Sequence, residues 1–399
     1  MCSLLVKKIA IIKNSFYPKS IKMNYKYIKE MHEKYSASDE SQLLFEKIIN
    51  ASTDQKEEVS KGVHLLVEKV GLAYALLALY RQQVNSGFVL ADPLNTEEKE
   101  EKIFFDSDTG VTFHVQWNPD RELRKNHELL IERGVIAEKG NETKLINRDK
   151  SGKACYLCKI NIDTQNPGEI LLDMNLRGEK YFAGANFAYI TNNHYTIMSE
   201  EHRPQQYRKK IVEVLNDFVD KTDGYFRAIF NGLAGASIEE HEHIQATTEE
   251  FPIERLKIEN RDVLYESNDI RVSNPKYYCP VRVVEGTGRT NTEDAADKII
   301  SKWHDLDEQY HTVNLIAAKP DNQYRIFIIL RDKRKLAGNG KNGAIASFET
   351  GGRIILSYEP EVKSGKKTNE RETFDKANLE TIKGLLKDIS PEKQLTEIY

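Results

Sequence analysis

Apolar positions change their spacing along the chain, and this divides the sequence into a helical region followed by a region of strands. Between residues 25 and 100 the apolar residues recur at helical spacing, and Gly62–Gln83 is apolar on almost every side. A helix that lacks a polar face is typical of a buried helix. We therefore expect His64 to lie in the core or at its boundary rather than to act as a ligand.

Beyond residue 100, short runs of branched and aromatic residues alternate with helical stretches, which predicts a mixture of strands and helices. Strands are expected at residues 103–105, 111–117, 181–190, 195–198, 225–230, 241–246, 312–317 and 323–330, and helices at 205–220, 295–306 and 374–389. The polar stretch 138–154 is expected to be an insertion. The charged stretch 361–376 is expected to be a linker.

The second half of the chain follows an order of elements similar to that of the first half. The segment around Asn268 resembles the segment around Asn186, an offset of 82 residues (268 − 186). The same offset carries His241 to Gln323, so the second copy lacks the histidines. This pattern favours an internal repeat of one α+β unit.

The composition limits the kinds of function that the chain can have. The formal net charge is −4, which does not indicate a nucleic-acid-binding protein, so a phosphate site has to be local. No apolar run approaches the ~20 residues that a membrane-spanning helix needs. The four cysteines include only one close pair, which does not indicate a disulfide framework. We expect a cytoplasmic protein without a membrane or nucleic-acid partner.

The segment Asn231–Gln245 contains a histidine, a second histidine and a glutamine at two-residue intervals: His241, His243 and Gln245. In a strand, alternate side chains leave the same face. A neutral imidazole on that face can attack a phosphorus atom and form a covalent intermediate. A glutamine can hold a phosphate oxygen but cannot donate a proton as an acid, which favours transfer to a phosphate acceptor over hydrolysis.

Cys155 and Cys158 form a Cys-x-x-Cys pair upstream of this segment. Such a pair can chelate one tetrahedral zinc ion when two further ligands close the site. The candidates for these ligands are His202 and His241, and His194 is an alternative to His202. A pair of buried or redox-active cysteines is the other interpretation.

These motifs resemble the transferase branch of the histidine-triad superfamily, whose signature is His-x-His-x-Gln. The branch includes galactose-1-phosphate uridylyltransferases, diadenosine tetraphosphate phosphorylases and GDP-hexose phosphorylases. The resemblance implies that His243 is the covalent nucleophile and that Gln245 holds phosphate. Asn231 and Ser237 match phosphate-contacting residues, although the spacing from Ser237 to the histidines differs by about one residue from the uridylyltransferase pattern.

The resemblance also extends to segments upstream of the histidines. In uridylyltransferases that bind zinc, the ligands match Cys155, Cys158, His202 and His241. Asn186 matches an asparagine beside the bound nucleoside, although Asn192 stands where the phosphorylases usually have proline. Val115–Arg121 resembles a strand that ends in Asn-Pro-x-Arg, which implies that Arg121 reaches phosphate.

The fold that the resemblance implies is α+β, with two histidine-triad-like lobes of antiparallel sheet and helices and an N-terminal helical extension. We expect the extension at 1–100, the first lobe with the active-site strand at 101–255, the second lobe without the histidines at 256–360, and a charged linker with a C-terminal helix at 361–399.

The implied activity is transfer of a nucleoside monophosphate through a nucleotidyl-histidine. The donor would be a nucleoside diphosphate sugar or a dinucleoside polyphosphate, and the acceptor a sugar 1-phosphate or phosphate. A hydrolase and a non-catalytic, zinc-containing nucleotide-binding protein are the alternatives. The sequence leaves the base, the sugar and the formation of a homodimer open.

Two other motifs are weaker indications of function. Gly338–Gly343 spells GxGxxG, but no strand and helix flank it as a dinucleotide site requires, so it is expected to be a loop. The basic run Arg331–Lys335 is usually a solvated turn. In the resembling relatives, however, a basic strand end of the second lobe faces the site of the first.

Overall fold

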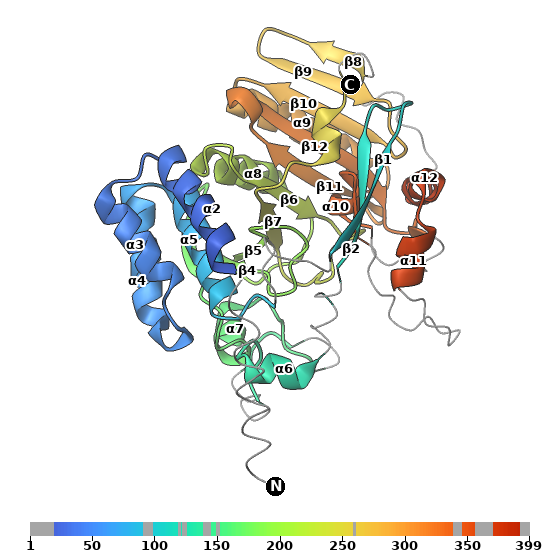
Figure 1. Ribbon diagram of the computed structural model, residues 1–399. Coiled ribbons are helices and arrows are strands. Elements are labelled where there is room, and N and C mark those ends of the chain that lie inside the picture. The colour runs from blue at the N-terminus through green and yellow to red at the C-terminus, as the bar shows by residue number, and fades with distance from the viewer. Residues whose placement is uncertain are drawn as a thin grey trace.

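The computed structural model describes residues 20–90, 99–118, 121, 126–138, 145–148, 152–257, 261–337, 345–355 and 370–391. Its centre is a ten-stranded sheet in the order β3-β4-β5-β7-β6-β11-β12-β10-β9-β8. A separate three-stranded sheet has the order β1-β2-β13. In Figure 1 the N-terminal helices lie on one side of the long sheet and the C-terminal helices lie on the other.

The predicted N-terminal helical region is present. Its helices are α2 (Ser20–Lys34), α3 (Asp39–Ile49), α4 (Lys56–Lys69) and α5 (Leu72–Asn85), with the short turn η1 (Thr53–Gln55) before α4. The expected single helix at Gly62–Gln83 is interrupted, because Gly71 has a φ of 128°, which a residue with a side chain rarely adopts. His64 is half-buried and its Nδ1 lies 2.8 Å from the Ser60 carbonyl oxygen, as expected of a boundary residue.

The first half of the long sheet consists of antiparallel strands around the histidine motif. These strands are β3 (Leu172–Leu176), β4 (Glu179–Ala185), β5 (Tyr195–Ser199), β6 (Arg227–Asn231) and β7 (His243–Thr247). Helix α8 (Lys209–Lys221) packs on one face through its buried apolar side. Residues alternate between the two faces: Phe230 packs with α8, whereas Ile229 packs in the core on the opposite face.

The second half repeats this arrangement. Its strands are β8 (Arg261–Glu266), β9 (Ile270–Pro275), β10 (Val281–Gly286), β11 (His311–Ala318) and β12 (Tyr324–Asp332), and α9 (Arg289–Asp305) covers the same face as α8. The order β8-β9-β10-β12-β11 mirrors β3-β4-β5-β7-β6. Antiparallel pairing of β6 with β11 joins the halves into one sheet. This repetition supports the division after residue 255, which stays a proposal.

The detailed alignment of the two copies differs from the one predicted. Asn186 follows β4, whose counterpart in the second half is β9. Asn268 instead lies before β9, in the connection from β8. The two segments are therefore not equivalent. The prediction matched similar apolar runs that belong to different hairpins.

The face of the sheet opposite α8 is covered by the three-stranded sheet and the C-terminal helices. These elements are β1 (Glu100–Phe105), β2 (Thr112–Trp117), β13 (Arg353–Ile355), α10 (Ser347–Thr350), α11 (Glu370–Lys376) and α12 (Leu379–Asp388). The predicted final helix is thus two helices, because the Asn378 side chain caps a new start at α12. The remaining short elements are α6 (His127–Glu132), α7 (Lys159–Gln165), η4 (Pro252–Arg255) and η6 (Pro320–Asn322).

Among the described residues, no helix combines the length and the apolar character that crossing a bilayer requires. Gly338–Gly343 and most of the expected linker 361–376 lie outside the described residues, as does part of the expected insertion 138–154.

Candidate active site and metal centre

The structure brings the predicted metal ligands together. One ligand atom from each of Cys155, Cys158, His202 and His241 lies within 4.8 Å of the other three. The cysteines lie before α7, and the histidines follow β5 and precede β7. His194, the alternative ligand, is not part of this group.

The spacing of these atoms fits a tetrahedral ion. The Sγ atoms of Cys155 and Cys158 lie 3.4 and 3.6 Å from Nδ1 of His241, and the Nδ1 atoms of His202 and His241 lie 3.3 Å apart. Around a zinc ion with ordinary bond lengths, such edges would measure roughly 3.5 Å and roughly 3.3 Å. The remaining pairs lie within 4.8 Å, so small rotations would complete the tetrahedron.

Neighbouring groups orient these ligands. Nε2 of His241 lies 2.8 Å from the Ser199 carbonyl oxygen, so Nε2 carries the proton and Nδ1 faces the cysteines as a free donor atom. Asn147 donates from Nδ2 to Sγ of Cys158 at 3.1 Å. Burial, together with the neighbouring Cys158, raises the pKa of Cys155 to about 12. The Cys155 thiol would therefore stay protonated unless a cation compensated the thiolate charge.

His243 lies beside this cluster, with one ring nitrogen fixed by the backbone. Its Nδ1 lies 2.8 Å from the carbonyl oxygen of His241. A carbonyl oxygen only accepts, so the proton is on Nδ1, and the lone pair of Nε2 is available. Burial lowers the pKa of His243, which keeps the ring neutral at neutral pH. A neutral ring with a free Nε2 is the form that can act as a nucleophile.

The prediction that His241, His243 and Gln245 share one strand face is correct for His243 and Gln245 but not for His241. Strand β7 begins at His243, and His241 lies just before it. His243 pairs with Met198, and Gln245 pairs with Thr196, so His243 and Gln245 share a face, while Ile244 points into the opposite core. The position of His241 outside the strand leaves its ring free to turn toward the cysteines.

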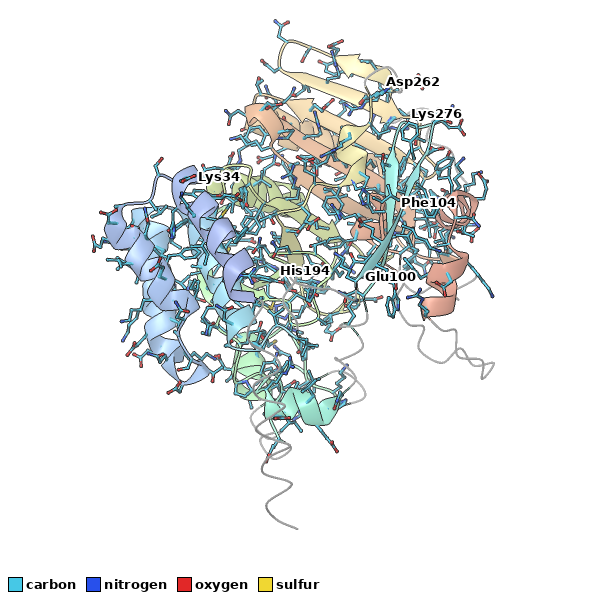
Figure 2. The ribbon with its side chains drawn as sticks, viewed as in Figure 1. Lys34, Glu100, Phe104, His194, Asp262 and Lys276 are labelled. Atoms are coloured by element: carbon cyan, nitrogen blue, oxygen red, sulfur yellow. The ribbon has the colours of Figure 1, made fainter. Side chains whose placement is uncertain are left out.

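A buried histidine, His194, orients the side-chain amide of Gln245. His194 accepts a hydrogen bond from the Ile190 N–H at Nδ1, so its Nε2 carries the proton and donates to Oε1 of Gln245 at an Nε2–Oε1 distance of 3.3 Å. Burial lowers the pKa of His194 to about 3 and keeps it neutral. The Gln245 oxygen is thereby occupied, and its NH₂ group remains as a donor. Figure 2 marks His194 near the middle of the molecule.

Asn231 also lies at this site, and its side chain is already engaged. Its Oδ1 accepts hydrogen bonds from the backbone N–H and the Oγ–H of Ser347, at 2.9 and 2.6 Å. The ring of Phe348, the next residue of α10, packs edge-on against His194. Helix α10 therefore covers the region between Asn231 and His194.

The other predicted substrate residues take different positions. Arg121 donates from Nη1 to the carbonyl oxygens of Ala188 and Tyr189, beside the loop that begins at Asn186. Asn186 accepts from the Ala188 N–H through Oδ1, which shapes that loop. Ser237 is exposed.

The basic run after β12 is divided between core and surface. Arg331 is buried and donates to the carbonyl oxygens of Ile345 and Ala234, and burial lowers its pKa to about 10. It ties β12 to the loop that precedes the histidines. Arg334 pairs with Asp332 at the surface. Arg331 therefore contacts the first half of the chain, whereas Arg334 contacts the last residue of β12.

The site is closed in this conformation. His243 is 4% exposed. The described residues form three cavities away from this site, and His243 lines none of them.

Two contacts at the site involve residues without a predicted role. Gln205 hydrogen-bonds both the N–H and the carbonyl oxygen of His243, and Ser347 binds Asn231 from 116 positions along the chain. Gln205 follows a proline in the loop before α8, and nothing in its local sequence indicates a distant partner. Ser347 is the first residue of α10, and nothing in its local sequence indicates Asn231 as a partner.

The chain is similar in sequence to one family model and to several curated proteins. A family model described as a domain of unknown function (DUF4922) matches residues 97–248, which include both cysteines and the histidine motif. Galactose-1-phosphate uridylyltransferase 1 of Streptococcus pneumoniae is 28% identical over 269 residues, 60% of this chain and 54% of that protein. The galactose-1-phosphate uridylyltransferase of Clostridium acetobutylicum is 24% identical over 210 residues, 47% of this chain and 42% of that protein.

Over about half of its length, the chain is similar to galactose-1-phosphate uridylyltransferases. It matches only about half the length of these uridylyltransferases. Among solved structures, a yeast Ap4A phosphorylase in complex with AMP aligns with 79% of this chain and 94% of its own, at 13% identity and a TM-score of 0.47.

Proposed function

We propose that this uridylyltransferase homologue is a nucleotidyltransferase or phosphorylase that works through a covalent nucleotidyl-histidine at His243. The observation that carries the proposal is the contact of Nδ1 of His243 with the His241 carbonyl oxygen at 2.8 Å. It leaves Nε2 unprotonated on the strand face that also bears Gln245.

The proposed reaction has two half-reactions. Nε2 of His243 attacks the α-phosphorus of the donor, a P–N bond forms, and the P–O bond to the leaving phosphate breaks, with its electron pair passing to that oxygen. A phosphate oxygen of the acceptor then attacks the same phosphorus. The P–N bond breaks, and its electron pair returns to Nε2.

Gln245, Asn231 and Arg121 would hold the phosphate oxygens during both steps. The free NH₂ group of Gln245 and the guanidinium of Arg121 are donors that can stabilise the developing charge. Asn231 is occupied by Ser347, and Arg121 by backbone carbonyls. Nucleotide binding therefore requires these contacts to exchange for contacts with phosphate. Asn186 would lie beside the nucleoside, and the exposed Ser237 would reach a phosphate only after a change of its loop.

The metal that fits the four-ligand cluster best is zinc, because two thiolates and two imidazoles at tetrahedral spacing are its usual ligands. Cys155, Cys158, His202 and His241 would hold it. When bound, the ion would supply structural cross-linking. It would fix the loop before β7 and thereby the His241 carbonyl oxygen against which His243 is oriented.

The uridylyltransferase relatives point to a nucleoside diphosphate sugar as donor and a sugar 1-phosphate as acceptor; a dinucleoside polyphosphate with phosphate as acceptor is the other pair. Gln245 disfavours a hydrolase, because it cannot protonate a leaving group. The remaining alternative is a zinc-containing protein that binds nucleotides without reacting at His243.

A labelling experiment separates these functions. The protein is incubated with UDP-, GDP- and ADP-hexoses and diadenosine tetraphosphate, each radiolabelled at the α-phosphate, and is then denatured. A transferase or phosphorylase retains acid-labile, base-stable label that added sugar 1-phosphate or phosphate removes. A hydrolase forms product without an added acceptor, and a binding protein retains no label.

A further inference from the structure

Strands β6 and β7 separate at the residues that form the site. Their pairing runs from Arg227↔Thr247 to Ile229↔Gln245. Continued by two residues in the same register, it would place Asn231 opposite His243. The pairing ends before that point, although β6 extends to Asn231 and β7 begins at His243.

The side-chain amide of Gln205 lies between the strands at this position. Its Oε1 accepts a hydrogen bond from the His243 N–H at 2.7 Å. Its Nε2 donates to the carbonyl oxygen of Asn231 at 2.9 Å and to that of His243 at 2.8 Å. The amide thus links the His243 N–H to the Asn231 carbonyl oxygen, as a direct hydrogen bond between the strands would otherwise do.

The position of Gln205 explains why the separated strands remain stable. A buried backbone N–H or C=O without a partner is unfavourable, so strands do not open in a core without a substitute partner. Gln205 is fully buried and provides both a donor and an acceptor. Its own backbone is fixed, because its N–H donates to the Glu239 carbonyl oxygen at 2.9 Å.

We propose that Gln205 is a positioning residue for the nucleophile: its amide holds β6 and β7 apart at Asn231 and His243 and so sets the direction of the His243 ring. This inference rests on the proposed function of His243. The same amide bonds the backbone of Asn231, so one side chain sets the distance between the nucleophile and a phosphate-holding residue.

Two substitutions test the proposal, with a neighbouring glutamine as the matched control. Gln205→Met keeps the length of the side chain but removes the donor and the acceptor. Gln205→Glu keeps an acceptor for the His243 N–H but places a carboxylate oxygen against two carbonyl oxygens. Gln206→Met alters an exposed glutamine next in the chain.

Three quantities are measured: the rate of His243 labelling at saturating and at limiting nucleotide, the metal content, and the hydrogen exchange of the His243 amide. In Gln205→Met we expect labelling at saturation to fall about 10²-fold, as misplacement of a reacting group by about 1 Å does. The half-saturating nucleotide concentration and the metal content should stay unchanged. Exchange of the His243 amide should accelerate in Gln205→Met but not in Gln205→Glu, whereas Gln206→Met should match the wild type.

Normal labelling by Gln205→Met overturns the proposal. The proposal also fails if both Gln205 variants lose their metal and no longer unfold cooperatively, because that result would show a general structural role. If the wild-type protein takes up no label, the proposed function fails. Amide exchange then decides alone: unchanged exchange at His243 in Gln205→Met overturns the inference, and accelerated exchange supports its structural part, that the Gln205 amide holds β6 and β7 apart.

Discussion

Nδ1 of His243 lies 2.8 Å from the carbonyl oxygen of His241, so the proposed nucleophile is oriented by the backbone of a candidate metal ligand. The two side chains diverge from this shared backbone. His241 turns toward Cys155 and Cys158, and His243 remains on the face of β7. The two-residue spacing of the motif therefore connects the candidate metal cluster to the proposed nucleophile.

The metal cluster gives the first prediction. Cys158→Ser should abolish stoichiometric zinc binding and lower the Tm, because a hydroxyl is a much poorer zinc ligand than a thiolate. Metal analysis of the purified variant and thermal unfolding measure both effects. Cys279→Ser is the control, because Cys279 is buried in a different core and is not part of the cluster. Equal zinc content in wild type and Cys158→Ser would refute the assignment of the ligands.

Glu242, between the two histidines, gives a prediction about stability. Its carboxylate is fully buried and accepts from Nε and Nη2 of Arg208, at 2.7 and 2.8 Å, and from the Tyr181 hydroxyl at 2.6 Å. Glu242→Gln should lower the free energy of unfolding by about 3 kcal/mol, because it breaks a buried ion pair. This value is at the low end for such a change, since Arg208 keeps Glu179 as a partner.

Chemical denaturation provides the measurement, and Glu201→Gln provides the control. Glu201 pairs with Arg203 at the surface, where its side chain is 74% exposed. The loss there should stay within about 0.5 kcal/mol. Similar losses for the two variants would contradict the structural role assigned to Glu242.

Glu349 in α10 gives a prediction about pH. Burial raises the pKa of Glu349 to about 6 from the ordinary value of 4.5, although hydrogen bonds from the backbone N–H groups of Ala346 and Glu349 oppose the shift. The folded protein therefore holds this proton more tightly than the unfolded chain, and the contribution to stability declines as pH rises from about 4.5 through 6. Glu349→Gln should remove this decline and increase stability at pH 7 by about 2 kcal/mol.

Unfolding at a series of pH values, compared between wild type and Glu349→Gln, isolates this group, because every other titratable residue is the same in both proteins. A difference between the two curves that does not vary between pH 4.5 and 6 would show that Glu349 has no raised pKa. A difference that grows with pH across this range is the expected result.

The sequence predicted the elements of the fold well where the pattern is local. The α+β class, the N-terminal helices and the strands around the histidine motif followed from apolar spacing. The break at Gly71 was not predicted, because it depends on one residue with a positive φ inside an apolar run. The pairing of β6 with β11, which joins the two halves, depends on long-range contacts that spacing does not encode.

The clustering of Cys155, Cys158, His202 and His241 was predicted residue by residue, because zinc ligands have a recognisable spacing and the resemblance supplied the distant histidines; the metal itself stays a prediction. The contacts of Gln205, Ser347 and His194 could not be predicted in this way. Each depends on one side chain reaching a partner far along the chain, and the sequence on either side of it is ordinary for a loop or a helix start. The assignments of His243, Gln245, Asn231 and Arg121 to catalysis stay predictions.

The most direct measurement for the whole account is covalent labelling of His243. Wild-type protein and His243→Ala are incubated with the panel of α-labelled nucleotides, digested, and analysed for a labelled peptide. We expect the wild type to carry nucleotide on the peptide that contains His243, and His243→Ala to carry none while retaining its metal and its fold. Equal labelling of the two proteins, or turnover by His243→Ala at the wild-type rate, would contradict the account.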